Sequence, residues 1–154
     1  MRSRDRTCGA WHSGPRGFTL PELATVVAIL GVVASVVVPP VGRTLDRAAV
    51  REGVERLAAA HATARELAIS RGALARLEID REARTVAVSV QRTATAWDTI
   101  ATYPLGTAQI ACSNPTLVFN PIGLGYGASN TRVIFTRGAA ADTVTTSRTG
   151  RLRR

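Results

Sequence analysis

The stretch that decides the fold is Arg16-Gly17-Phe18-Thr19-Leu20-Pro21-Glu22-Leu23, followed by an apolar run that continues to Val41. Sixteen residues without a charge run from Leu23 to Val38, and 24 residues from Phe18 to Val41 carry only one acid. A helix of this length spans roughly 30–36 Å at about 1.5 Å per residue, which is enough for the core of a bilayer. We therefore expect one membrane-spanning helix over residues 18–41.

Two ordinary interpretations of this run leave something unexplained. A cleaved secretory signal needs a small-residue site after the apolar run, whereas Val36-Val37-Val38-Pro39-Pro40 follows here. A plain uncleaved anchor does not account for Glu22, because an acid inside a span costs about 2.5–3.5 kcal/mol on insertion scales. The segment before the span has four Arg and one Asp. We expect it to be unstructured, and its charge favours the cytoplasmic side.

The segment Gly17-Phe18-Thr19-Leu20-Pro21-Glu22 resembles the processing site of type IV prepilins and type II secretion pseudopilins. The resemblance implies that residues 1–17 are a leader, which the prepilin peptidase removes by cutting after Gly17. It implies that Phe18 is then N-methylated and that Glu22 stays in the bilayer. A buried charge is tolerated when it is paired, so Glu22 is expected to act in assembly by pairing with a neighbouring subunit.

The pattern after the span predicts an amphipathic second half of the helix over residues 42–72. Pro39-Pro40 and Gly42 predict a kink or a melted turn where the two halves meet. Gly72 is expected to end the helix. Apolar or small residues at helical spacing form one predicted stripe: Leu45, Ala48, Ala49, Val54, Leu57, Ala58, His61, Ala64, Leu67 and Ala68.

From Leu74 onward the apolar period changes to two, which predicts a β-rich domain over residues 73–154. The Gly-rich segment 120–130 fits neither a G-x-G-x-x-G turn before a helix nor a phosphate-binding P-loop, so we expect a hairpin turn. Strands are expected at 74–80, 85–91, 97–105, 109–112, 116–119, 131–136 and 143–147.

Two further features resemble the GspH/FimT branch of minor pseudopilins and minor pilins. One is an F-x-P-x-G turn at Phe119, Pro121 and Gly123, and the other is G-R-x-R at residues 150–153. The resemblance implies an α+β, type IV pilin-like fold, in which a long N-terminal helix, transmembrane in its first half, packs on an antiparallel β-sheet domain. It also implies a single-pass protein of the bacterial inner membrane, with its C-terminal domain in the periplasm, that joins other pilins or pseudopilins in a filament.

The chain ends in a cluster of basic residues and has a net charge of +9. Arg binds phosphates well, and such binding weakens with salt. The resemblance to FimT-like minor pilins implies DNA binding for uptake through G-R-x-R, whereas the alternative is a solvated basic terminus or a final strand. Arg132 and Arg137 would extend the cluster if the strands place them beside it. The candidate DNA-binding residues are Arg148, Arg151, Arg153 and Arg154.

The remaining residue types give no sign of an enzyme, a metal site or a cofactor. Without the leader, Cys112 is the one cysteine, so no intramolecular disulfide or CxxC-type metal set is expected. His61 is expected to be a core-edge residue. Two functions therefore stay open: a structural subunit of a type II secretion pseudopilus or type IV pilus, and a pilus-borne DNA receptor. Members of both systems share the residues used above.

Overall fold

The computed structural model describes residues 17–127 and 130–154, so residues 1–16 of the predicted leader lie outside it. One helix, α1 (Leu20–Arg71), precedes eight strands. The chain divides into two compact units between Val38 and Pro39. The backbone of α1 stays helical through Pro39 and Pro40, so the predicted melted turn is wrong. Each proline removes one N–H from the helix and crowds the carbonyl four residues earlier, which bends a helix without having to end it, so the kink stays a prediction.

The described part of the first unit, residues 17–38, is a mainly apolar stretch of α1 with the three residues that precede it. Every described side chain from Gly17 to Val36 is exposed. This part of α1 therefore contributes nothing to a folded core of its own.

In the second unit, one face of α1 is buried at helical spacing, as predicted. The buried stretch begins at Ala49 and reaches Ala68, with Ala60 and Ala64 fully covered. Leu45 and Ala48 are exposed, so the predicted stripe starts one turn too early. The N–H of Gly72 donates to the carbonyl of Ile69, and the N–H of Ala73 to that of Ala68, which caps the helix at the expected place.

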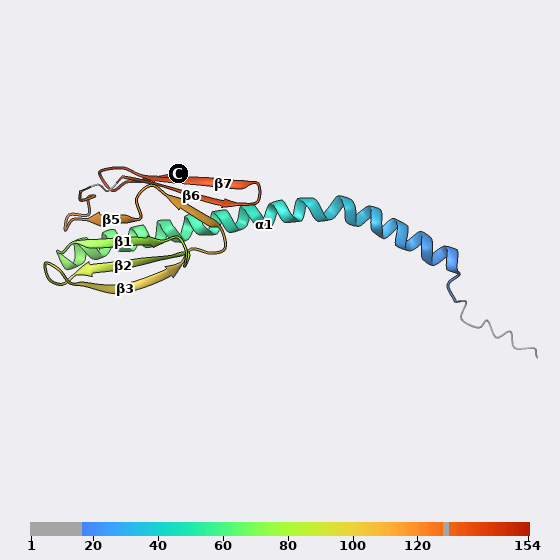
Figure 1. Cartoon of the computed structure of the whole chain (residues 1–154), viewed down its shortest axis with the longest axis horizontal. Helices are drawn as coiled ribbons and strands as arrows, with labels where there is room; N and C mark the ends of the chain where they lie inside the picture. Colours follow the sequence, from blue (N-terminus) through green and yellow to red (C-terminus); the bar gives the residue numbers. More distant parts are fainter. Residues whose placement is uncertain (1–16, 128–129) are drawn as a thin grey trace, which may run out of the picture. The chain divides into compact units, whose positions relative to one another are not determined.

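Two four-stranded antiparallel sheets pack along this part of the helix (Figure 1). The first sheet has the order β3-β2-β1-β5 and the second the order β4-β6-β7-β8. This arrangement confirms the predicted α+β fold. The strands of the first sheet are β1 (Ala75–Asp80), β2 (Thr85–Gln91), β3 (Trp97–Pro104) and β5 (Thr116–Phe119). Those of the second are β4 (Gln109–Cys112), β6 (Thr131–Arg137), β7 (Ala140–Thr146) and β8 (Leu152–Arg153).

The core lies between α1 and the inward faces of both sheets. Alternate residues of β1, β2 and β6 point inward, and Leu77, Val88 and Phe135 among them are fully buried. Gly53 on α1 lets the ring of Phe135 approach, because a Cβ built on Gly53 would lie 2.7 Å from that ring. The buried residues of the core cluster all lie between Val50 and Val144.

The Gly-rich segment after β5 is not the expected hairpin turn. It joins β5 in one sheet to β6 in the other, and these strands do not pair. The side chain of Asn120 accepts hydrogen bonds from the backbone N–H groups of Ile122 (3.2 Å) and Leu124 (2.8 Å). A single bridge between Phe119 and Gly125 closes the turn. The segment therefore folds back locally instead of pairing two neighbouring strands.

Candidate functional site

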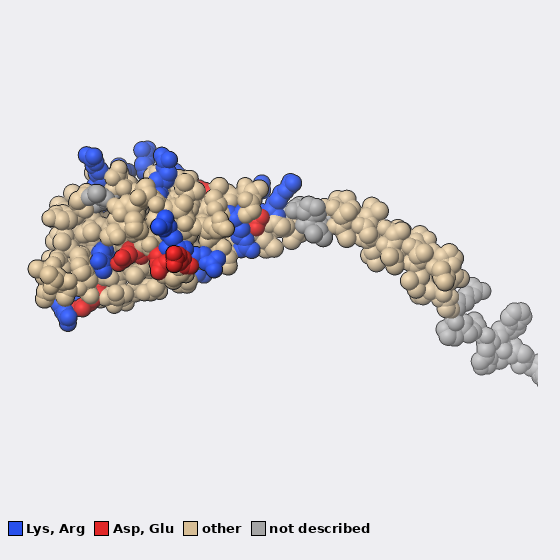
Figure 2. All heavy atoms as spheres, in the orientation of Figure 1, with Lys and Arg blue, Asp and Glu red and all other residues tan. Residues whose placement is uncertain are grey.

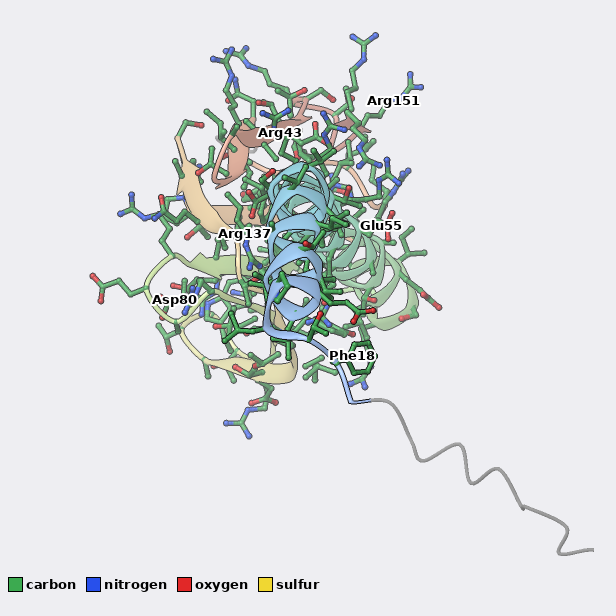
Figure 3. All side chains as sticks on the ribbon, turned by 90° about the vertical axis from the view of Figure 1, so that its right-hand side faces the viewer. Phe18, Arg43, Glu55, Asp80, Arg137 and Arg151 are labelled. Atoms are coloured by element: carbon green, nitrogen blue, oxygen red, sulfur yellow. The ribbon has the colours of Figure 1, made fainter. Side chains whose placement is uncertain are left out.

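The predicted processing site lies directly before the first turn of α1. Gly17, Phe18 and Thr19 are exposed and not helical, and Figure 3 shows Phe18 where the chain enters the helix. The carbonyl of Thr19 accepts the N–H groups of Glu22 (3.0 Å) and Leu23 (3.1 Å), so Thr19 is the N-cap residue. The backbone on both sides of the Gly17–Phe18 bond is therefore open to an enzyme.

Glu22 has a local structural role that the sequence interpretation did not include. Its Oε2 lies 3.4 Å from the backbone nitrogen of Thr19, which donates to it, and 3.5 Å from the Thr19 hydroxyl. Thr-x-x-Glu with this return contact is one half of a capping box, in which the acid satisfies a free N–H group at the helix start. In the single chain, Glu22 thus caps its own helix.

The apolar part of α1 is long and apolar enough to cross a membrane. Large side chains from Leu23 to Val36 are about half exposed or more. An apolar surface of this size is unusual for a protein in water and indicates contact with lipid or with another protein.

The four candidate Arg residues of the C-terminal tail, residues 148–154, differ in their contacts. Arg148 and Arg151 lie in and after the turn that follows β7, and Arg153 lies on β8; all three are exposed. Figure 3 shows Arg151 at the edge of the domain. Arg154 is held by Asp142, with Nε 3.0 Å from Oδ2. Three of the four are therefore exposed without an ion pair among the described residues, and part of the tail forms the final strand that was one of the alternatives.

The sheet adds Arg132 to this group but not Arg137. Arg132 pairs with Thr145 across β6 and β7, and Thr145 pairs with Arg153 across β7 and β8. The three residues form one row across the sheet, and both Arg side chains are exposed. Arg137, at the other end of β6, pairs with Asp46 at 3.3 Å and donates to Thr107. Figure 2 shows the basic side chains that project from this domain.

Gly150, the first residue of G-R-x-R, has a packing role. Its φ is +74°, which side chains other than glycine rarely adopt. A Cβ built there would lie 2.9 Å from the backbone nitrogen of Gly125 and 3.2 Å from Cε1 of Phe119. The glycine therefore lets the tail pack directly on the core, which fixes where Arg151 stands.

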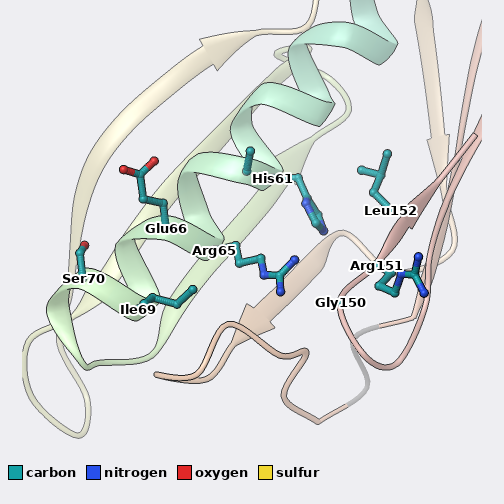
Figure 4. Close-up of a pocket in the computed structure, with 9 residues that line it drawn as sticks. His61, Arg65, Glu66, Ile69, Ser70, Gly150, Arg151 and Leu152 are labelled. Carbon is teal, nitrogen blue, oxygen red and sulfur yellow. The ribbon is translucent and has the colours of Figure 1, made fainter.

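A groove that the sequence did not predict lies between α1 and this tail (Figure 4). It has a volume of about 550 Å³, and His61, Arg65 and Ile69 face Arg151 and Leu152 across it. His61 is buried, as expected for a core-edge residue, but its Nε2 has no hydrogen-bond partner. Burial and then the charge of Arg65 lower the pKa of His61, whereas a hydrogen bond with the Gly150 backbone raises it.

In residues 17–127 and 130–154, no group of three or more His, Cys, Asp or Glu side chains is placed to hold a metal ion. Cys112 is a free, partly buried thiol on β4. Cys8 lies outside the described residues.

The fold of this chain is similar to that of solved pilin and pseudopilin structures. The type IV minor pilin FimU of Pseudomonas aeruginosa aligns over 68% of this chain and 86% of its own, at 15% identity and a TM-score of 0.56. The chain has the type IV pilin-like fold. The minor pseudopilin EpsH of the Vibrio cholerae type 2 secretion system aligns over 66% and 94%, at 16% identity and a TM-score of 0.53. No family model and no curated protein matches the sequence.

The pilin-like fold confirms the GspH/FimT-type fold expected from the sequence. FimU is a minor pilin and EpsH a minor pseudopilin. At this level of identity the comparison concerns the fold alone.

Proposed function

We propose that this chain is a minor subunit of a type II secretion pseudopilus or a type IV pilus. Three features that occur together in one chain support this proposal: an exposed Gly17–Phe18 bond, an apolar helical segment whose described side chains are exposed, and a pilin-like domain. In the precursor, the helix lies in the bacterial inner membrane as a single span with residues 42–154 in the periplasm. The prepilin peptidase removes residues 1–17, and the helix then enters a filament core among other pilins.

Glu22 and Phe18 have linked roles in this proposal. Cleavage gives Phe18 a positively charged, N-methylated amine, and Glu22 on a neighbouring subunit neutralises that charge as the helix leaves the bilayer. The long contact between Glu22 and Thr19 is weak enough to be exchanged for such an ion pair. A charge that is costly in lipid thus becomes a contact in the filament.

Filament incorporation tests this proposal. The tagged full chain is expressed in a bacterium that assembles such filaments, and sheared filaments are probed for it. We expect wild-type chain in the filament fraction. We expect Glu22→Ala to be cleaved and membrane-bound but absent from filaments, with Glu55→Ala, an exposed acid on the same helix, as the matched control. Incorporation of Glu22→Ala at the wild-type level would sink the assembly role of Glu22.

A second candidate function is DNA binding, favoured by the row Arg132–Thr145–Arg153 with Arg151 beside it. Each Arg that contacts a phosphate adds about 0.9 to the slope of log affinity against log salt. Duplex DNA binding by residues 42–154 is measured at several salt concentrations. The double variant Arg151→Ala/Arg153→Ala is expected to lower the slope by about 2, and Arg71→Ala/Arg81→Ala is the control. Absence of salt-sensitive binding would exclude this receptor role.

A further inference from the structure

We propose that the groove between α1 and the tail binds a carboxylate carried on an apolar group, with Arg65, Arg151 and His61 as its polar partners. In a filament subunit this ligand is an acidic side chain of another subunit, flanked by apolar side chains. The inference that another subunit supplies the carboxylate rests on the proposed function. The inference that the groove binds a carboxylate on an apolar group does not.

The polar wall of the groove supplies positive charge that the chain itself leaves unmatched. Arg65 on α1 and Arg151 on the tail both line it, and among the described residues neither takes part in an ion pair. Figure 4 shows the Arg65 side chain reaching from the helix toward the tail. Glu66 also lines the groove, but adjacent helix residues point in different directions, so it does not neutralise Arg65. An anion is therefore the ligand that this wall favours.

His61 is the second, independent observation. Its side chain is 7% exposed, and Nε2 is buried without a partner although its ring lies at the groove (Figure 4). A buried polar atom without a hydrogen bond costs free energy, so a ligand that pairs with it gains affinity. An imidazolium N–H donates to a carboxylate oxygen. A neutral imidazole with its hydrogen on Nε2 donates to the same oxygen, and a bound carboxylate favours the imidazolium form further.

The apolar wall selects a carboxylate over inorganic phosphate or a nucleic acid backbone. Ile69, which is 53% exposed, and Leu152 line the same groove. Beside it, the turn after β5 exposes Ile122 and Leu124. These surfaces offer contact area to a branched apolar group but nothing to a fully hydrated phosphate. The charged groups that face His61 are Arg65 and Glu66 from α1 and Arg151 from the tail.

The test follows histidine NMR signals of the full chain in dodecyl maltoside micelles, with ¹⁵N-labelled histidine. The chain has two histidines, His12 and His61, and His61→Gln assigns the spectrum. The probe is 4-methylpentanoate, and 4-methylpentanamide has the same shape without the charge. For a ligand of about eight heavy atoms, the expected dissociation constant is on the order of 10 mM.

We expect 4-methylpentanoate to shift the His61 signals in a saturable way and to move their titration midpoint to higher pH. Arg65→Gln/Arg151→Gln should weaken this binding at least about tenfold, because two charge-assisted contacts are lost. Arg71→Gln/Arg81→Gln, which also removes two exposed charges, should leave it unchanged. The same double variants expressed in cells should still be cleaved after Gly17, which separates failure of this site from failure of the proposed function.

Four results would overturn the proposal. One is no His61 response to the carboxylate, and another is an equal response to the amide. A third is binding that survives in Arg65→Gln/Arg151→Gln. The fourth is tighter binding of inorganic phosphate or duplex DNA at His61, which would make the groove a phosphate site.

Discussion

His61 on α1 stands edge-on to Phe119 on β5, with ring centroids 5.0 Å apart and an interplanar angle of 89°. Gly150 of the tail packs on the same phenyl ring. Phe119 therefore joins three segments that are distant in sequence: the helix, the first sheet and the C-terminal tail. Edge-to-face geometry of this kind is favourable beyond the area that it buries.

Truncation of this ring should strongly destabilise the second unit. Phe119 is fully buried, so Phe119→Ala should lower the free energy of unfolding by about 3–5 kcal/mol. Residues 42–154 contain the whole core cluster and serve for denaturant unfolding. Ile122→Ala is the control, because Ile122 is 70% exposed in the next turn and should change stability little. Equal effects of the two variants would show that Phe119 is not the centre of this packing.

Stability should depend on pH through His61. Burial and the charge of Arg65 lower its pKa below the usual value of 6.5. The unfolded chain then binds the proton more readily, so this stabilisation is fully present above pH 6.5 and is lost as pH falls through the lowered pKa. Between about pH 7.5 and pH 5, wild type should lose more stability than His61→Gln. Identical losses would mean that His61 titrates normally in the folded chain.

Gly150 should be sensitive to a methyl group for two separable reasons. In Gly150→Ala, alanine would have to adopt a φ of +74°, which is unfavourable for a residue with a side chain. Its Cβ would also lie 2.9 Å from the backbone nitrogen of Gly125. Gly127 has a similar φ of +70°, but a Cβ there meets nothing within 4 Å. Gly127→Ala should therefore cost only the backbone term of about 1 kcal/mol, and Gly150→Ala at least about 2 kcal/mol. The measurement is the denaturant midpoint of unfolding of each variant. Equal midpoints would contradict a packing role for Gly150.

If the tail binds DNA, its four Arg residues should contribute unequally. Arg154 is already paired with Asp142 at 3.0 Å, whereas Arg153 is exposed on the row with Arg132. Arg153→Ala should therefore lower duplex DNA affinity more than Arg154→Ala, and Asp142→Asn should raise it by removing a competing negative charge. Filter binding at low salt measures all three. A larger loss from Arg154→Ala would place the DNA contact elsewhere on the tail.

Local sequence patterns predicted the elements better than their partners. Strands 85–91, 109–112 and 116–119 begin and end where expected, because alternating apolar residues and turn residues act locally. β7 begins at Ala140, earlier than expected, because Ala139–Ala141 lack the β-branched residues that signal a strand. The division into two sheets was missed, since a period of two does not identify the neighbouring strand.

The same distinction applies to the sites. The processing motif is contiguous and could be read directly, as could the Arg residues of the tail. The groove joins His61 to Gly150 and Arg151, and no local pattern links such distant positions. The pairing of Arg154 with Asp142 and of Arg137 with Asp46 likewise depends on strand register. Sequence alone therefore could not show which Arg residues form ion pairs.

The most direct test of the central claim is the mass of the N-terminal peptide of chain extracted from membranes that contain a prepilin peptidase. The account predicts a peptide that begins at Phe18 with one added methyl group on its amine. Gly17→Ala should remain uncut, and Gly14→Ala, a glycine change within the leader, should be cut normally. A chain that still begins at Met1, one cut after the apolar run, or normal cutting of Gly17→Ala would contradict the account.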